Sequence, residues 1–565
     1  VYVSIKNQRN LFVQAPTGIG KTMAAVYPAV KAMGDGYGEK LFYLTAKTIA
    51  RGVAADSLEI LRGQGLHFKS VMITAKEKIC PLEEMTCDPE TCPYAKGHYD
   101  RINKAIYDCV TNEYNITRDI LLQYANKHMV CPFELGLDVS LFVDGIICDY
   151  NYVFDPRVKL RRYFGEGAKG DYIFLVDEAH NLVDRASSMY SAAIHKEDFL
   201  AMRKLLLPYH AKIGRLLAAC NKEMLAFKKE CDTAKGYVMI EDMESLYVKL
   251  IRLQAQFESF LEESKEIGAL KPHQEEILDF YFTINQFINI YELVDESYEI
   301  YGEQVNDKSF MVKLYCIHPA HNLSECIEKG NATVSFSATM LPIQYYKELL
   351  HDEEEDYAIY IPSPFPKEHR GLLVGNDVSS RYKARGPAQY ERMARYLDIM
   401  VHGKRGNYMA FFPSYKMLED VYDMAMSLGL LSDIEVVKQT AHLNEEEREQ
   451  FLERFAAGKD PVLGFCILGG IFSEGIDLVG ERLVGAAVIG TGLPMVCNER
   501  EIQQHYFEER EGKGFAYAYL YPGMNKVQQA AGRVIRTMED KGVILLLDDR
   551  FGTRQVVDTF PAEWD

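Results

Sequence analysis

The sequence predicts an α/β protein built on parallel β-sheets with crossover helices. Short apolar runs alternate with amphipathic stretches over residues 11–60, where 11–13 and 41–44 read as strands and 23–33 reads as a helix. The same alternation returns over residues 145–176 and over 408–551. At 565 residues the chain is too long for one core, so we expect about three to five domains.

Two stretches interrupt this alternation. Residues 76–135 carry cysteines, prolines and short polar segments. Residues 181–330 read as almost wholly helical, with apolar side chains at steps of three and four. Because such stripes are normally the packed faces of helices, we expect a helical insertion without a cofactor of its own.

The composition disfavours several classes of protein. Hydrophobic residues make up 48% of the chain, as in ordinary globular proteins. No apolar run reaches the length of about 18 residues that is needed to span a membrane. The chain starts at Val1 without a signal peptide, so we expect a cytoplasmic protein with further sequence upstream. The net charge of −19 disfavours nonspecific coating of nucleic acid. A local groove of Lys and Arg would still act within a Debye length of about 8–10 Å.

A phosphate-binding loop is predicted between the first strand and the first helix. The segment A-P-T-G-I-G-K-T matches the pattern G-x-x-x-x-G-K-[ST], except for alanine at its first position. Backbone N–H groups at a helix N-terminus suit phosphate oxygens, while a lysine would contact the β/γ-phosphates and a threonine would hold Mg²⁺. The expected nucleotide-binding residues are Ala15, Pro16, Thr17, Gly18, Ile19, Gly20, Lys21 and Thr22.

A carboxylate pair ends the strand that we expect over residues 172–176. The sequence there continues as D-E-A-H, which places acidic side chains at the tip of a central strand beside the phosphate loop. We expect Asp177 to orient Mg²⁺ through water and Glu178 to polarise the attacking water. His180 is expected to couple hydrolysis to a second domain.

Three further segments complete a two-domain nucleotide motor. Residues 337–340 have the small hydroxyl side chains of a loop between domains, and residues 473–477 follow a predicted strand. Residues 529–536 put Gln529, Arg533 and Arg536 at helical spacings that share one face. An arginine that reaches the γ-phosphate from the opposite domain is a common means of sensing ATP. Gly475 and Asp477 are expected to line the same nucleotide site.

Five of the twelve cysteines lie between positions 80 and 131. Four thiolates suit either tetrahedral zinc or an iron–sulfur cluster, although the two close C-x-x-C pairs of zinc ribbons are absent. Buried cysteines without a ligand are the third interpretation. The segment is poor in long apolar periodic runs, so we expect it to need a metal to fold. The expected ligands are Cys80, Cys87, Cys92 and Cys131, whereas Cys109 is expected to be a small buried residue.

The sequence resembles the XPD/DinG branch of superfamily-two helicases over essentially its whole length. The matching motifs are the phosphate loop, the D-E-A-H segment and residues 363–366, 473–477 and 529–536. A further match is D-Y-N-Y at 149–152, which is followed by Asp155-Pro156. The family's glutamine-bearing segment that contacts adenine is not found before Ala15. A preference for ATP therefore follows from the resemblance alone.

The resemblance implies an α/β architecture of two RecA-like parallel-sheet motor domains, the first interrupted by an iron–sulfur insertion and by a helical Arch. It also implies a 4Fe–4S cluster on the four cysteines, Mg²⁺, and ATP as substrate. The expected domains are residues 1–75, 136–180 and 331–345 (first motor), 76–135 (iron–sulfur), 181–330 (Arch) and 346–565 (second motor). The implied activity is ATP-dependent 5′→3′ translocation by a monomer on single-stranded or forked DNA, with duplex unwinding in repair or replication-associated processing.

Contacts to DNA are expected where family loops have counterparts in this chain. Small hydroxyls and backbone N–H groups after the second strand would hold phosphates without reading sequence. Either aromatic ring of the D-Y-N-Y segment could stack on a base, or one of the two could pack under the sheet. The expected contact residues are Thr45, Lys47, Thr48, Tyr150, Tyr152 and Ser414.

Other activities fit parts of this pattern. A translocase that remodels protein–DNA complexes or RNA–DNA hybrids would use the same motifs. A redox-sensing regulator with a slow ATPase is disfavoured by the complete hydrolytic set. A nuclease has no support in these residues and would need a domain upstream.

Overall fold

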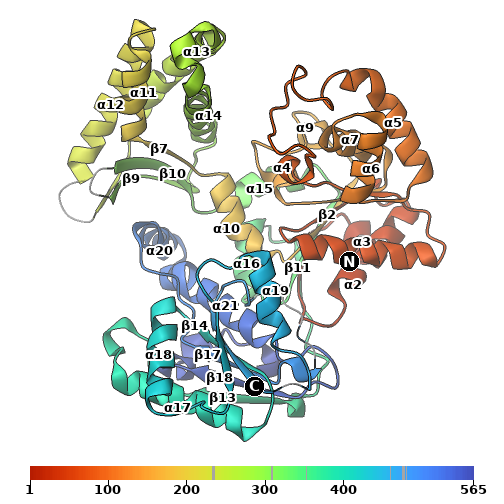
Figure 1. Ribbon diagram of the computed structural model, residues 1–565, viewed down its shortest axis with the longest axis vertical. Helices are drawn as coiled ribbons and strands as arrows, with labels where there is room; N and C mark the ends of the chain where they lie inside the picture. Colours follow the sequence, from red (N-terminus) through yellow and green to blue (C-terminus); the bar gives the residue numbers. More distant parts are fainter. Residues whose placement is uncertain are drawn as a thin grey trace.

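The computed structural model describes residues 1–231, 236–306, 309–351, 353–458, 460–473, 478 and 480–564. They form two parallel sheets, which lie one above the other in Figure 1, and a smaller antiparallel sheet in the arm at its upper left. No helix in the described part of the chain is both long and apolar enough to cross a membrane.

The first parallel sheet has the strand order β12-β1-β11-β6-β2-β5-β3-β4. Its central strands β6 and β11 are buried along their whole length, as expected for a sheet covered on both faces. The strands are β1 (Leu11–Gln14), β2 (Lys40–Leu44), β3 (Ser70–Met72), β4 (Asn115–Ile116), β5 (Gly145–Cys148), β6 (Tyr172–Asp177), β11 (Ala332–Ser337) and β12 (Tyr357–Tyr360). The associated helices are α1 (Tyr2–Lys6), α2 (Lys21–Gly34), α3 (Thr48–Gly63), α8 (Asn151–Phe154), α9 (Arg161–Phe164) and α16 (Ile343–Leu350).

The first sheet extends further along the chain than we expected. Residues 357–360 were assigned to the second motor, but β12 pairs in parallel with β1 at the edge of the first sheet. Helix α16 contacts both strands, so it belongs with the first sheet as well. The alternation of strand and helix fixes the elements, but it does not say which sheet an edge strand joins.

The cysteine-rich insertion lies at the other edge of the first sheet. It contains α4 (Lys76–Ile79), α5 (His98–Asn112), α6 (Arg118–His128) and α7 (Pro132–Val139), and it includes β4, which pairs with β3. We expected this segment to have little core of its own. However, α5, α6 and α7 pack together and bury Ile102, Cys109, Leu121 and Leu135. The helical half of the insertion therefore has an apolar core, and the loop over residues 80–97 has no helix or strand.

The second insertion contains a β-sheet, whereas we expected an almost wholly helical segment. Its four strands form an antiparallel sheet, here called the arch sheet, in the order β7-β10-β9-β8. Strand β10 alternates buried and partly buried side chains over most of its length, a period-two pattern hidden between long helices. The elements are α10 (His180–Met189), β7 (Ala192–His195), α11 (Lys196–Leu206), α12 (Ala211–Cys231), β8 (Tyr237–Met239), α13 (Glu244–Glu266), α14 (Gln274–Tyr291), β9 (Tyr298–Asn306), β10 (Ser309–Cys316) and α15 (Ala320–Ile327).

The second parallel sheet has the strand order β13-β18-β17-β14-β16-β15. Its strands are β13 (Arg370–Gly375), β14 (Tyr408–Phe412), β15 (Glu435–Lys438), β16 (Val462–Ile467), β17 (Gly485–Ile489) and β18 (Gly542–Leu547). The helices are α17 (Pro387–Gly403), α18 (Tyr415–Ser427), α19 (Glu445–Glu453), α20 (Asn498–Glu511), α21 (Tyr521–Ala531) and α22 (Arg554–Val557).

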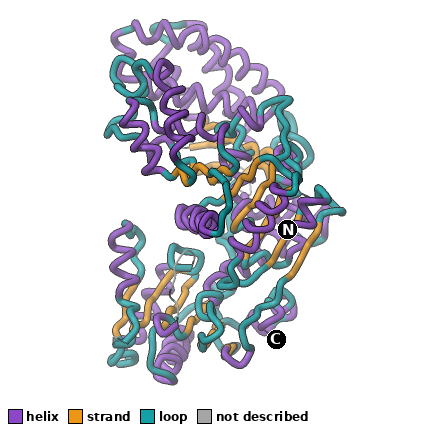
Figure 2. The backbone as a smooth tube through the Cα atoms, turned by 90° about the vertical axis from the view of Figure 1, so that its right-hand side faces the viewer, coloured by secondary structure: helices purple, strands orange, loops and turns teal. Residues whose placement is uncertain are grey.

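Helix α20 joins the second sheet's domain to the arm. Lys313 on β10 lies 2.5 Å from Glu499 on α20, and the Asn498 amide donates to Glu303 on β9 at 2.7 Å. The arm with α11–α14 stands at the top of Figure 2, at the opposite end from the second sheet. The arm is thus rooted in the first sheet and also contacts the second domain.

Candidate functional site

The phosphate loop connects β1 to α2 and is held against the neighbouring strand. The backbone N–H of Ala15 donates to the carbonyl of Ser337 at the end of β11, at 2.9 Å. Gly20 caps α2 with φ +77°, and Gly18 has φ +82°, a region that favours glycine. Lys21, the first residue of α2, donates to the carbonyl of Pro16 at 3.4 Å. The loop therefore has the strand–turn–helix geometry that the motif requires.

The carboxylates of the D-E-A-H segment lie beside this loop. The buried carboxylate of Asp177 accepts a hydrogen bond from the Tyr43 hydroxyl at 2.8 Å. Burial and the neighbouring Glu178 raise the pKa of Asp177 to about 6. Burial lowers the pKa of Lys21, while Glu178 and Asp177 raise it. The charges of these side chains therefore act on the protonation of both Lys21 and Asp177. Tyr43, on β2, carries no signal in the sequence.

His180 links the two sheets. Its Nδ1 lies 2.6 Å from the Ser337 hydroxyl, which in turn donates to Glu178 at 3.2 Å. Its Nε2 lies 2.7 Å from the side-chain nitrogen of Gln529 on α21. A continuous chain of contacts therefore runs from the acidic residue through one imidazole to the second domain, which supports the coupling role that we predict for His180.

The phosphate loop itself touches the second domain. The Thr17 hydroxyl donates to the carbonyl of Gly532 at 3.1 Å, and Ile19 packs against the apolar core of the second sheet. A Cβ atom placed on Gly18 would lie 2.1 Å from the carbonyl oxygen of Arg536. The loop and the 529–536 segment therefore meet in direct contact.

Helix α21 ends at Ala531, so Arg533 and Arg536 lie beyond it and do not share a helix face with Gln529 as we expected. The two arginines are held by different partners. Arg533 donates from Nε to the carbonyl of Ser473 at 3.1 Å and lines the cleft with Glu178 and Gln529. The backbone N–H of Arg536 donates to Asp540 at 2.8 Å. Both positive charges lower the pKa of Lys21 beyond the effect of burial. Gly475 and Asp477, which we also expected at this site, lie outside the described residues.

The four expected metal ligands line a single cavity of about 210 Å³. Cys92 is buried, Cys80 and Cys131 are half-buried, and Cys87 is exposed with φ +53°. Backbone N–H groups of residues 133 and 134, at the start of α7, hydrogen-bond the Cys131 sulfur and lower its pKa, although burial raises it more. Within the described ranges, no three His, Cys, Asp or Glu side chains are arranged to hold a metal ion. The four soft thiol donors around one cavity nevertheless fit an iron–sulfur cluster chemically.

Cys109 is not part of this cavity. It is fully buried in α5, and burial raises the pKa of its thiol to about 12. A thiol that stays protonated among apolar neighbours behaves as a small hydrophobic residue, as predicted.

A basic groove of about 890 Å³ lies between α3, the start of the cysteine-rich insertion and the 149–162 segment. Two carboxylates, Glu77 and Asp149, lie among its lining residues. Its positive side chains are Arg51, Lys76, Lys78, Lys159, Arg161, Arg162 and Arg185. In a chain of net charge −19 this local excess is suited to phosphate oxygens. The basic run over residues 157–162 was the signal in the sequence that could have predicted it.

The structure separates the expected DNA contacts into two groups. Thr48 and Tyr152 line the basic groove, where a bound DNA strand could reach them. Thr45 and Tyr150 are fully buried, so the expectation that they contact DNA is wrong. The Thr45 hydroxyl accepts a hydrogen bond from the backbone N–H of Lys47 at 3.4 Å and so shapes the loop from within.

The other two expected contacts lie elsewhere. Lys47 lines the nucleotide cleft, beside Pro16 and Thr17. Ser414 caps α18, where its hydroxyl accepts from the backbone N–H of Met417 at 3.3 Å. A direct DNA contact by either residue stays a prediction.

Three family models match successive parts of the chain. The DEAD/DEAH box helicase model matches residues 1–81, DEAD_2 matches 67–199, and the helicase C-terminal domain matches 397–565. The chain is 23% identical to the probable ATP-dependent helicase MJ0942 of Methanocaldococcus jannaschii, covering 98% of this chain and 90% of that protein. It is 22% identical to the ATP-dependent DNA helicase XPD of Sulfolobus acidocaldarius, covering 98% and 94%. CHL1 of Candida glabrata is 21% identical, but this chain spans 62% of that protein's length.

Solved structures share the fold. An XPD helicase structure superposes with a TM-score of 0.60 at 17% identity, covering 99% of this chain and 96% of that one. The structure of S. tokodaii Xpd4 superposes with a TM-score of 0.58 at 15% identity, covering 97% and 94%. Together with the assembled phosphate loop, D-E-A-H segment and arginine segment, the matches show that the chain belongs to the XPD/DinG family of superfamily-two helicases and is an ATP-dependent helicase.

Proposed function

We propose that this ATP-dependent DNA helicase moves 5′→3′ along single-stranded DNA as a cytoplasmic monomer and separates forked duplexes, in repair or replication-associated processing. The observation that carries the proposal is the position of the basic groove. It is bounded by residues 46–51 of the first motor, the start of the cysteine-rich insertion, and Arg185 on the helix that follows the D-E-A-H segment. A strand held there would contact both the motor and the insertion.

The hydrolytic residues would divide the work as follows. Lys21 would contact the β/γ-phosphates of ATP, and Glu178 would orient the attacking water. Mg²⁺ near Thr22 and Asp177 would neutralise phosphate charge when bound. The His180 imidazole contacts Ser337 on one side and Gln529 of the second domain on the other, so it would transmit a change at Glu178 during hydrolysis to the second domain.

We propose that Cys80, Cys87, Cys92 and Cys131 hold a 4Fe–4S cluster. The common cavity, the soft donors and the backbone N–H groups near Cys131 support this. The loop over residues 80–97 has no helix or strand, so a cluster would supply folding free energy that burial does not. Iron and sulfide analysis of anaerobically purified protein tests this proposal, and zinc without iron would contradict it.

Strand displacement on tailed duplexes tests the activity. A duplex with a 5′ single-stranded tail should be unwound with ATP, and one with a 3′ tail should not. Lys21→Ala should abolish the reaction while binding to single strands persists, because this lysine contacts phosphate and not the DNA groove. Efficient displacement from a 3′ tail would overturn the proposed direction. ATP turnover with translocation but no displacement would favour the remodelling translocase.

A further inference from the structure

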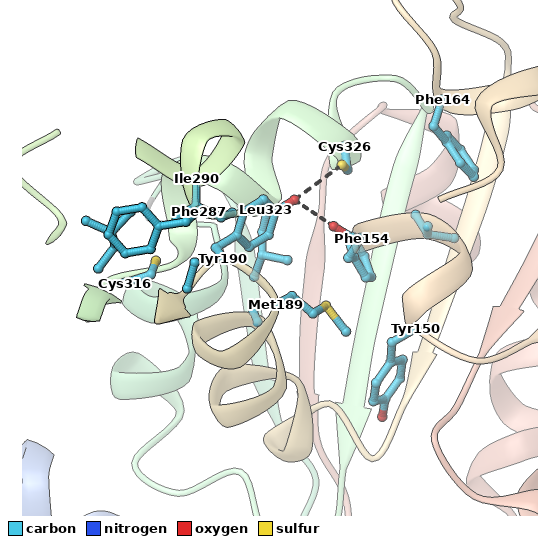
Figure 3. Close-up of a cluster of buried hydrophobic side chains, with 14 of the residues drawn as sticks. Tyr150, Phe154, Phe164, Met189, Tyr190, Phe287, Ile290, Cys316, Leu323 and Cys326 are labelled. Carbon is cyan, nitrogen blue, oxygen red and sulfur yellow. Dashed lines mark hydrogen bonds between the residues drawn. The ribbon is translucent and has the colours of Figure 1, made fainter. Parts of the chain in front are cut away.

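The D-Y-N-Y segment has two faces with different surroundings. Asp149, Asn151 and Tyr152 line the basic groove. Tyr150, between them, turns inward and is fully buried, in the same cluster as Phe154 (Figure 3). One short segment therefore joins the groove proposed for DNA to the interior of the first motor.

The inward side chain ends at the backbone of the two acidic residues of the D-E-A-H segment. The Tyr150 hydroxyl faces the backbone carbonyls of Asp177 and Glu178, with the second at 3.1 Å, and both contacts are hydrogen bonds. One hydroxyl hydrogen is thus shared between two acceptors. Glu178 has φ +51°, a left-handed conformation that costs a non-glycine residue about 1–3 kcal/mol and persists only where its surroundings hold it. The phenol of Tyr150 is part of that support.

The outward side chains are tied to groove arginines. Asp149 accepts from Arg51 at 3.1 Å and from Arg185 at 2.9 Å. Arg185 also donates to Asn151 at 2.7 Å, and its guanidinium lies 5.9 Å from the centroid of the Tyr150 ring. The Arg185 side chain is 38% exposed, so it is open to an anion in the groove. A DNA phosphate would compete with the carboxylate for these two cations.

We propose that Tyr150 is a positioning residue that couples DNA in the groove to the placement of Glu178. A phosphate that draws Arg185 and Arg51 toward the strand loosens their hold on Asp149, and the segment shifts. The buried phenol carries this shift to the two carbonyls and so to the residue that orients the attacking water. The proposal rests on the proposed function, because it needs DNA to bind in the groove.

The test is Tyr150→Phe in the full chain, which removes one hydroxyl and leaves the ring in place. We expect the ratio of DNA-stimulated to basal ATP turnover, measured with saturating oligo(dT), to fall at least about fivefold. The oligo(dT) concentration for half-maximal binding, measured by fluorescence anisotropy, should stay within about twofold, since the phenol does not reach the groove. The matched control is Tyr163→Phe. Tyr163 is also buried, and its hydroxyl contacts Ser140 at 2.9 Å, so the loss of that hydroxyl should leave the ratio unchanged.

A second variant covers the case in which Tyr150→Phe fails to fold. Asp149→Asn weakens the ion pairs at the groove and should also lower the ratio at saturating DNA. If both single variants fold, the double variant should lose no more than the larger single loss, as expected for residues on one path.

Four results separate the inference from the proposed function. A normal ratio in Tyr150→Phe, or in Asp149→Asn where the first variant is unfolded, would overturn the inference and leave the helicase assignment intact. Losses that add fully in the double variant would also overturn it. So would a loss that disappears at higher DNA concentration, because it would reflect weaker binding. A wild-type chain whose ATPase ignores oligo(dT) would contradict the proposed function itself, and the inference with it.

Discussion

Replacing Gly18 with alanine tests whether contact between the phosphate loop and the second domain is needed for hydrolysis. The added Cβ would lie 2.1 Å from the carbonyl oxygen of Arg536 and 2.9 Å from its carbonyl carbon. Both neighbours are backbone atoms, so the loop and the 529–536 segment would have to separate by about 1 Å or more to restore ordinary contact. The left-handed φ adds about 1–2 kcal/mol of strain for any non-glycine residue.

The expected effect on turnover follows from this displacement. A misplacement of about 1 Å at a catalytic group costs about 10²-fold in rate, so kcat for ATP should fall by roughly that factor in Gly18→Ala. The matched control is Gly36→Ala. Gly36 has φ +84°, and a Cβ added there would meet no atom within 4 Å, so this variant carries the same strain without the collision. Steady-state ATPase and thermal unfolding of both variants give the comparison. Equal unfolding midpoints together with wild-type kcat in Gly18→Ala would refute the reasoning.

Four further outcomes are expected. Glu178→Gln should bind ATP but not hydrolyse it, measured by nucleotide binding beside phosphate release. Arg536→Ala should slow hydrolysis about 10³–10⁵-fold if it acts as an arginine finger, whereas a twofold loss would show that its charge does not act on the γ-phosphate. Cys80→Ser should remove the iron–sulfur absorbance and unwinding but spare much of the ATPase, while Cys109→Ser should keep all three. Burial raises the pKa of Asp548, but the hydrogen bonds from Arg550 and Ser380 and the positive charge of Arg550 together lower it to about 2. Its contribution to the free energy of unfolding, about 2 kcal/mol, should therefore be present above pH 4 and lost as the pH falls toward 2. Urea titrations at several pH values should show that the free energy of unfolding depends less on pH in Asp548→Asn than in the wild type.

The motifs of the nucleotide site could be located from the sequence because each is a recognisable local pattern at the end of a predicted strand. The phosphate loop and the D-E-A-H segment follow β1 and β6, and parallel strands bring their carboxyl ends to one edge. The sequence predicted that His180 couples hydrolysis to the second domain. It could not identify Gln529 as the side chain that His180 contacts, since the two residues are 349 positions apart.

Other features depend on information that the sequence does not carry locally. Tyr150 and Tyr152 are two positions apart, yet one is buried and the other faces the groove, because a short helix begins between them. The arch sheet was missed although β9 and β10 are adjacent in the sequence and pair with each other, because the other two strands, β7 and β8, are very short and lie between long helices. The partner of β12 could not be inferred, because either sheet offered an open edge.

The double attachment of the arm constrains how the two motor domains can separate. Helices α10 and α15 connect the arm to the first sheet. The arch sheet also contacts α20 of the second domain through Lys313 and Glu499. With the contacts across the nucleotide cleft, these attachments close a ring, and a ring cannot widen at one joint while the others stay fixed. The joint at α20 is more than an ion pair partly open to solvent, which would contribute only about 0–1 kcal/mol, because Ile502, Tyr506 and Phe507 of α20 pack into the same apolar core as the arm. Each opening of the cleft must therefore either break that joint or carry the arm along with it.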